Sequence, residues 1–130
     1  MIRVLVVDDH PVLRAGLEAV LRAEPGFRCV GAVADSEAMR RVLGRTRPDV
    51  VVLDRNLGQE DGLDVCRRLR AEPSPPAVVL YTAEVVGLAP AAEAAGAASV
   101  VDKTRPVEEL FDAIRLAGRR LQAARPPRAA

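Results

Sequence analysis

Five polar side chains stand at the ends of apolar runs in the 130-residue sequence: Asp8, Asp9, Asp54, Thr82 and Lys103. Two carboxylates about 4 Å apart repel each other by about 4 kcal/mol at an effective dielectric constant of 20, so three of them can share a site only with cations. Lys103 supplies one positive charge, and a divalent ion that prefers oxygen ligands supplies the rest. With a hydroxyl added, such a site can stabilise a phosphoryl group during transfer. The residue types therefore predict phosphoryl chemistry with Asp54 as the nucleophile.

Mg²⁺ is the ion that these ligands favour, because carboxylates, water and a backbone carbonyl are its usual partners. No cluster of histidine or cysteine residues offers zinc an alternative. His10 is the only histidine, and we interpret it as an exposed turn residue, with adjustment of the neighbouring acidic pair as the alternative. Cys29 and Cys66 form no Cys-x-x-Cys motif and are expected to be reduced core thiols. Lys103 is the only lysine in a chain that otherwise uses arginine, and a compact ammonium suits a phosphate pocket.

The run Val50-Val51-Val52-Leu53 is the element that must position Asp54. Its β-branched residues are typical of a strand that is buried on both faces. Similar runs alternate with helical patterns in five strand-then-helix units, which predict a parallel sheet with helices on both faces. We expect a doubly wound, flavodoxin-like α/β fold with five parallel strands in the order 2-1-3-4-5. The carboxyl ends of these strands would share one edge, where the polar side chains meet.

Periodicity and helix start and stop signals give the expected elements. Strands are expected at residues 4–7, 27–34, 50–53, 77–81 and 99–101, and helices at 11–23, 35–43, 63–71 and 106–121, with a short one starting at Pro90. Gly87 and Pro90 cannot both lie inside one stable helix. The polar loop 55–62 is expected to be flexible. The buried stripe of the first helix is expected to contain Val12, Leu13, Leu17, Val20 and Leu21, and the last helix should bury Leu116 or Ala117.

Length and composition indicate one domain over residues 1–121, followed by a linker or disordered tail over 122–130. Nineteen Lys and Arg residues against eighteen Asp and Glu residues leave a charge near zero, which does not call for a nucleic acid or an anionic membrane as partner. The apolar N-terminus is interrupted by Asp8 and Asp9 too early for a signal peptide or a membrane span. We therefore expect a cytoplasmic protein.

The pattern of Asp8-Asp9, Asp54, Thr82 and Lys103 resembles the receiver domain of two-component response regulators, over nearly the whole chain to Leu121. The local sequences at residues 8–17 and 48–54 are similar to those of the nitrate-regulator branch. Members of that branch usually carry a LuxR-type helix-turn-helix domain after the receiver. Transcription control through DNA would then belong to a domain outside this chain.

The resemblance also implies a role for each residue. Asp54 accepts a phosphoryl group from a sensor histidine kinase, and the chain is a phosphoacceptor rather than a turnover enzyme. Asp9, Asp54 and the backbone carbonyl of Asn56 coordinate Mg²⁺, and Asp8 acts through a metal-bound water. Thr82 donates a hydrogen bond to a phosphoryl oxygen, while Lys103 pairs with the phosphate or, before phosphorylation, with Asp54. Phosphorylation is expected to allow homodimer formation.

The chain departs from the family pattern at three places. Val100 stands where an aromatic switch residue is usual, Gly58 stands where proline is common, and Gly87 and Pro90 interrupt the fourth helix region. We therefore expect phosphate uptake to be retained while the structural response to it is atypical.

Three functions other than that of a phosphorylated receiver domain are compatible with an α/β fold of this kind. A haloacid-dehalogenase-like phosphatase needs a second carboxylate two residues after the nucleophile, where this chain has Asn56. A flavin carrier needs a first loop that cradles phosphate, whereas Asp8 and Asp9 would repel it. A degenerate receiver that acts as a binding module without phosphorylation stays open, because of Val100 and the irregular region around Pro90.

Overall fold

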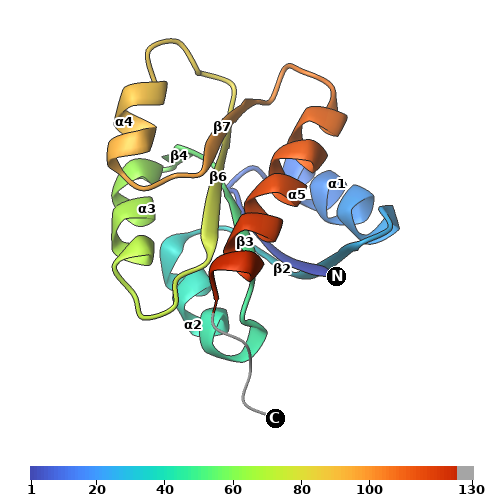
Figure 1. Ribbon diagram of the computed structural model, residues 1–130. Helices are drawn as coiled ribbons and strands as arrows, with labels where there is room; N and C mark the ends of the chain where they lie inside the picture. The colour runs from blue at the N-terminus through green and yellow to red at the C-terminus, as the bar shows by residue number, and fades with distance from the viewer. Residues whose placement is uncertain (126–130) are drawn as a thin grey trace.

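Alternate residues of the first strand pack on opposite faces of a sheet. In β1 (Ile2–Val7), Val4 and Val6 join one apolar core, and Leu5 and Val7 join the other. This alternation follows from the two-residue period of a strand, and it requires apolar cover on both sides. The computed structural model, which describes residues 1–125, shows helices on both faces of this sheet (Figure 1).

The strand order confirms the predicted topology. The five-stranded sheet has the order β2-β1-β3-β6-β7, and all its neighbours are parallel. Counted by strand-then-helix units, this is the predicted order 2-1-3-4-5. The remaining strands are β2 (Phe27–Val33), β3 (Val50–Leu53), β6 (Ala77–Thr82) and β7 (Ser99–Asp102), with a small separate hairpin of β4 (Asn56–Leu57) and β5 (Glu60–Asp61).

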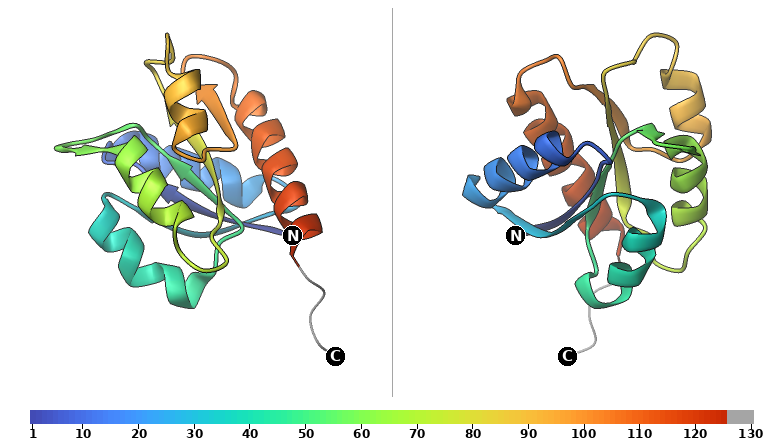
Figure 2. Two further views of the ribbon diagram at one scale, coloured as in Figure 1. Left: turned by 60° about the vertical axis from the view of Figure 1, so that its left-hand side comes forward. Right: turned by 180° about the vertical axis from the view of Figure 1, so that it is seen from behind.

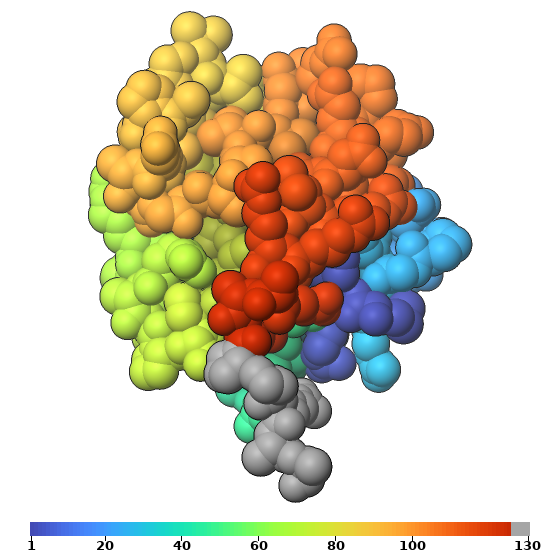
Figure 3. All heavy atoms as spheres, viewed as in Figure 1, coloured from blue at the N-terminus to red at the C-terminus, as the bar shows by residue number. Residues whose placement is uncertain are grey.

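The helices divide into two groups, one for each face of the sheet. They are α1 (Pro11–Ala23), α2 (Ser36–Thr46), α3 (Gly62–Arg70), α4 (Ala89–Ala94) and α5 (Val107–Ala124). The core on one face is completed by α1 and α5, and the core on the other face by α2, α3 and α4. Figure 2 shows the two groups on opposite sides of the sheet, and Figure 3 shows α5 running down the front of the molecule.

The structure corrects several details of the sequence-based predictions. Loop 55–62 is not irregular throughout, because its residues form the β4–β5 hairpin. Of the predicted stripe on α1, only Leu17 and Leu21 are buried, and the other members, Val12, Leu13 and Val20, are exposed. Val12 and Leu13 lie in the first turn of α1, next to the edge of the sheet, and are not covered by the core. Leu17 and Leu21 are four residues apart and face the core, and Val20 lies beside this buried stripe.

The ends of two helices also lie further along the chain than expected. The second helix continues to Thr46, where Arg47 ends it in a left-handed conformation, and the last one continues to Ala124 instead of residue 121. Within it Ala117 is buried, while Leu116 is 50% exposed. Residues 126–130 of the expected linker lie outside the described residues.

The region between β6 and β7 agrees with the expected short helix. Gly87 adopts a positive φ of 72° before α4, and Pro90 lies in its first turn. Both cysteines are free, and Cys66 is fully buried. Among residues 1–125, no helix combines the length and the apolar character that crossing a membrane requires.

Candidate active site

Backbone hydrogen bonds just beyond the strand ends bring the candidate side chains together. The amide of Asp8 donates to the last carbonyl of β2 at 3.0 Å, and the amide of Asp54 donates to the last carbonyl of β1 at 3.1 Å. On the other side of the edge, the amide of Lys103 donates to the carbonyl of Thr82 at 3.0 Å. The parallel pairing that builds the sheet therefore also fixes where these side chains start.

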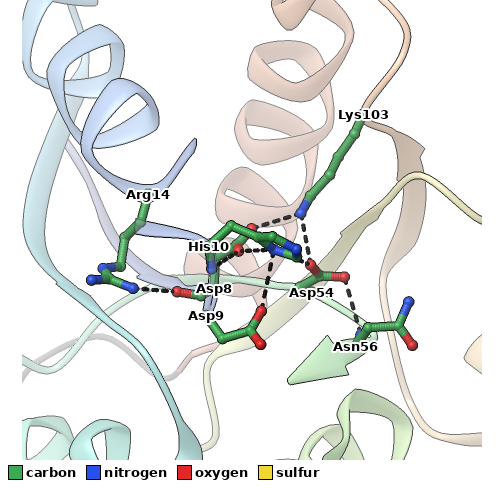
Figure 4. Close-up of polar contacts among 7 residues, drawn as sticks. All are labelled: Asp8, Asp9, His10, Arg14, Asp54, Asn56 and Lys103. Carbon is green, nitrogen blue, oxygen red and sulfur yellow. Dashed lines mark hydrogen bonds and ion pairs between the residues drawn. The ribbon is translucent and has the colours of Figure 1, made fainter. Parts of the chain in front are cut away.

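Lys103 joins the two most buried carboxylates (Figure 4). Its Nζ donates to Asp8 Oδ2 and to Asp54 Oδ2, each at 2.7 Å. The side chains of Asp8 and Asp54 are 3% exposed, and that of Lys103 is 11% exposed. Buried charges at such short range require a partner of opposite sign, because desolvation alone would make them unfavourable.

The pKa values of this group reflect the pairing. Burial by itself raises the pKa of Asp8, but hydrogen bonds from Lys103 and from the His10 amide outweigh it and hold the pKa below its usual range. Burial lowers the pKa of Lys103, but the hydrogen bonds and charges of Asp54 and Asp8 outweigh it and raise the pKa above its usual value. Both effects favour the ionised pair at neutral pH.

Asp9 and His10 complete a set of four possible metal ligands. Asp8, Asp9, His10 and Asp54 each offer one ligand atom, and these atoms lie within 4.8 Å of one another. Oδ1 of Asp9 is buried and, among residues 1–125, accepts no hydrogen bond. Nδ1 of His10 lies 3.2 Å from this oxygen, without the geometry of a hydrogen bond. Three carboxylates with one unsatisfied oxygen fit a hard divalent cation such as Mg²⁺.

Thr82 is placed at the same edge but does not join the ion pairs. It is the last residue of β6 and is 1% exposed. Its hydroxyl has no hydrogen-bond partner in the part of the chain that the structure describes. An unpaired buried hydroxyl costs about 1–3 kcal/mol, and an oxyanion bound at this edge is the type of acceptor that would satisfy it.

The β4–β5 hairpin closes the site on the side of Asn56. The amide of Asn56 donates to Asp54 Oδ1 at 3.1 Å, which orients the carboxylate that Lys103 holds through its other oxygen. Gly58 turns the hairpin with a positive φ of 63°, in a conformation that proline cannot adopt. Glu60 ties the hairpin to α2, because it accepts hydrogen bonds from the amide of Ser36, at 3.1 Å, and from its hydroxyl.

Sequence reasoning missed two residues of the site and left the role of a third between two interpretations. The side chain of His10 is 62% exposed, as expected of a turn residue, while its Nδ1 lies among the carboxylates, as the alternative interpretation requires. Arg14 donates from its guanidinium to the carbonyl of Asp8 at 2.8 Å, and its position four residues after His10 could have indicated this. Gly62 packs against the backbone of Asp54 so closely that a Cβ would collide with it, and the Asp-Gly pair before α3 was the available signal.

The comparison with protein families identifies the class of protein that combines this fold with acidic residues and a lysine at the carboxyl edge of the sheet. The family described as the response regulator receiver domain matches residues 4–115. The chain therefore belongs to the receiver domains of response regulators.

Individual relatives agree with the family. The transcriptional regulatory protein LiaR of Bacillus subtilis is 35% identical over 121 residues, which cover 92% of this chain and 57% of LiaR. A protein-glutamate methylesterase/protein-glutamine glutaminase of Anaeromyxobacter dehalogenans is 40% identical over 106 residues, which cover 80% of this chain and 29% of that protein. The chain thus spans less than two thirds of either relative.

Two solved structures are similar over most of their length. A LuxR-family two-component response regulator from Aurantimonas sp. superposes with a TM-score of 0.83 and 30% identity, covering 96% of this chain and 88% of that one. The signal receiver domain of NarL from Mycobacterium tuberculosis gives a TM-score of 0.82 and 28% identity, covering 91% and 96% respectively. These similarities agree with the predicted likeness to the nitrate-regulator branch.

Proposed function

We propose that Asp54 accepts a phosphoryl group from the phosphohistidine of a sensor histidine kinase. The observation that carries the proposal is the double ion pair of Lys103 with Asp8 and Asp54, each at 2.7 Å, at the carboxyl edge of the sheet. These three residues lie far apart in the sequence and come from three different strand ends, so a local turn or cap does not explain their meeting. A buried carboxylate that is paired with an ammonium and oriented by a backbone amide is a suitable nucleophile.

The residues around Asp54 have distinct tasks in the transfer. A carboxylate oxygen of Asp54 forms a bond to phosphorus while the bond from phosphorus to the kinase nitrogen breaks, and the released imidazole keeps that electron pair. The ammonium of Lys103 stabilises the negative charge on the phosphoryl oxygens during the transfer, and the hydroxyl of Thr82 donates a hydrogen bond to one of these oxygens. The amide of Asn56 keeps the carboxylate oriented through its 3.1 Å hydrogen bond.

Mg²⁺ is part of the proposal, because the donor set fits it and Asp9 has an unsatisfied carboxylate oxygen. Asp9, Asp54 and the backbone carbonyl of Asn56 would hold the ion, and Asp8 would act through one of its water ligands. When bound, the ion neutralises charge on the acid cluster and on the phosphoryl oxygens.

The output of the domain is proposed from the relatives. LiaR is a transcriptional regulatory protein, and the chain spans 57% of its length. We expect phosphorylation to allow homodimer formation and to control transcription in the cytoplasm through a DNA-binding domain outside these residues. The methylesterase relative carries a similar segment beside a different activity, so the output does not follow from the receiver alone.

Intact-mass analysis after treatment with a small phosphodonor such as acetyl phosphate tests the proposal. Addition of one phosphoryl group is expected with Mg²⁺ and not with a chelator. The Asp54→Asn variant should stay unmodified under both conditions. Modification of that variant to the same extent would contradict the assignment of Asp54, and a wild-type chain that never gains mass would favour a binding module that works without phosphorylation.

A further inference from the structure

Backbone hydrogen bonds hold the Cα of His10 next to the acid cluster, which consists of Asp8, Asp9 and Asp54. The amide of His10 donates to Asp8 Oδ1 at 2.9 Å, and its carbonyl accepts from the amide of Arg14 at 2.9 Å in the first turn of α1. Pro11 follows directly and fixes the start of that helix. The Cα of His10 therefore cannot move away from the carboxylates without unwinding the helix start.

The ring nitrogen lies at ligand-to-ligand distance from three acids. Nδ1 is 3.0 Å from Asp8 Oδ1, 3.2 Å from Asp9 Oδ1 and 3.7 Å from Asp54 Oδ2. Ligands bound at about 2.1 Å in an octahedron are about 3.0 Å apart when adjacent and about 4.2 Å apart when opposite. The distances to Asp9 and Asp54 fall in this range, so a single cation can contact Nδ1 together with these two carboxylates, while the contact with Asp8 is a hydrogen bond.

The net charge of the cluster is negative and can be balanced by a divalent ion. Lys103 contacts Asp8 and Asp54 but not Asp9, so three carboxylates share one ammonium. Two formal negative charges remain, and one divalent ion balances them. An imidazole that binds a metal through an unprotonated nitrogen adds a ligand without changing this balance.

We infer that Nδ1 of His10 is a direct ligand of the divalent cation and raises the affinity of the site for cobalt and nickel ions relative to Mg²⁺. This inference depends on the proposed metal site at the acid cluster. Imidazole nitrogen binds the later first-row metals much better than it binds Mg²⁺, which favours oxygen and holds its water ligands. The part of the affinity for cobalt and nickel that depends on the imidazole is what distinguishes this site from one with oxygen ligands alone.

The ring can present a free nitrogen to the ion. The 3.0 Å contact between Nδ1 and Asp8 Oδ1 does not fix the tautomer of the ring, because either ring nitrogen can carry the proton. In the tautomer with the proton on Nε2, the lone pair of Nδ1 can bind an ion. The side chain is 62% exposed, so the protonated Nε2 can be solvated at no cost in burial.

The single histidine of the sequence gives a direct test by pulsed electron paramagnetic resonance. Mn²⁺ bound to protein without a histidine tag should show the nitrogen coupling of one coordinated imidazole. The coupling should disappear in His10→Asn and in His10→Ser. His10 is the N-cap of α1, and Asn and Ser are both favoured at N-cap positions. These variants should therefore preserve the start of α1, which circular dichroism would verify.

Titrations of the metals alone supply the second readout. In both variants the affinity for Co²⁺ and Ni²⁺ should fall by about tenfold or more, while the affinity for Mg²⁺ should change by less than about threefold. If Mn²⁺ binds to the wild-type protein without nitrogen coupling, or if all metals weaken equally, the inference is wrong and the proposed phosphoacceptor stands. If no divalent ion binds even to the wild-type protein, the metal part of the proposed function fails as well.

Discussion

Replacement of Lys103 by methionine should expose the repulsion that its ammonium now cancels. Asp8 and Asp54 each accept a hydrogen bond from it at 2.7 Å, so the two accepting oxygens are at most about 5.4 Å apart, which is twice that distance. At about 5 Å and an effective dielectric constant of 20, two negative charges repel by about 3 kcal/mol. This agrees with the loss of about 3–5 kcal/mol that follows removal of one partner from a buried ion pair.

Urea unfolding at neutral pH measures the free energy of unfolding of Lys103→Met. In the presence of a chelator, we expect a loss of about 3 kcal/mol relative to the wild-type protein. Mg²⁺ should restore more of this stability in the variant than it adds to the wild-type protein, because the ion supplies the missing positive charge. As a control, Arg41→Met removes a cation from the exposed pair with Glu37 and should change stability by less than about 0.5 kcal/mol.

A double variant distinguishes charge repulsion from loss of packing. Adding Asp54→Asn to Lys103→Met removes one of the two repelling charges and should recover at least half of the lost stability. The reasoning would be refuted if Lys103→Met cost less than about 1 kcal/mol, or if the second substitution made the protein still less stable.

Three further predictions concern pH, packing and signalling. Because the pKa of Lys103 is raised and that of Asp8 is lowered on folding, their stabilisation should hold at neutral pH, be lost above about pH 10 and be lost below about pH 4. In denaturation curves, Lys103→Met should reduce the alkaline loss but not abolish it, because burial also raises the pKa of Cys66 and of Tyr81. Gly62→Ala should destabilise the fold by more than about 2 kcal/mol in urea, since its Cβ would lie 2.7 Å from the Cα of Arg55. Beryllofluoride should shift the NMR signals of the site fully but those of residues 83–101 only in part, and a full shift there would contradict the atypical response expected from Val100.

The fold could be predicted because its main signals are local and repeated. Each strand is a short apolar run, each helix has start and stop signals, and the right-handed crossover leaves few topologies. The short α4 was predictable for the same reason, since Gly87 and Pro90 are strong local signals. The limits of α2 and α5 were not, because helix ends depend on what the last turn packs against.

The candidate site was predictable in outline because a parallel sheet brings its strand ends to one edge. That rule brought Lys103 to Asp8 and Asp54, and the structure has these contacts. It does not determine the direction of a side chain on a turn, so the position of the His10 ring had to come from the structure. The hairpin after Asp54 was missed because each of its strands has only two residues, too few to show the alternating apolar pattern of a strand.

Because Lys103 is buried, the rate at which it reacts with a chemical reagent measures how often the pocket opens. This lysine is the only one in the sequence, and its side chain is 11% exposed. An amine-directed acylating reagent should therefore label the N-terminus quickly and the lysine only during excursions in which the ammonium leaves its carboxylates. The ratio of the two labelling rates would record how often the pocket opens, without any substitution in the protein.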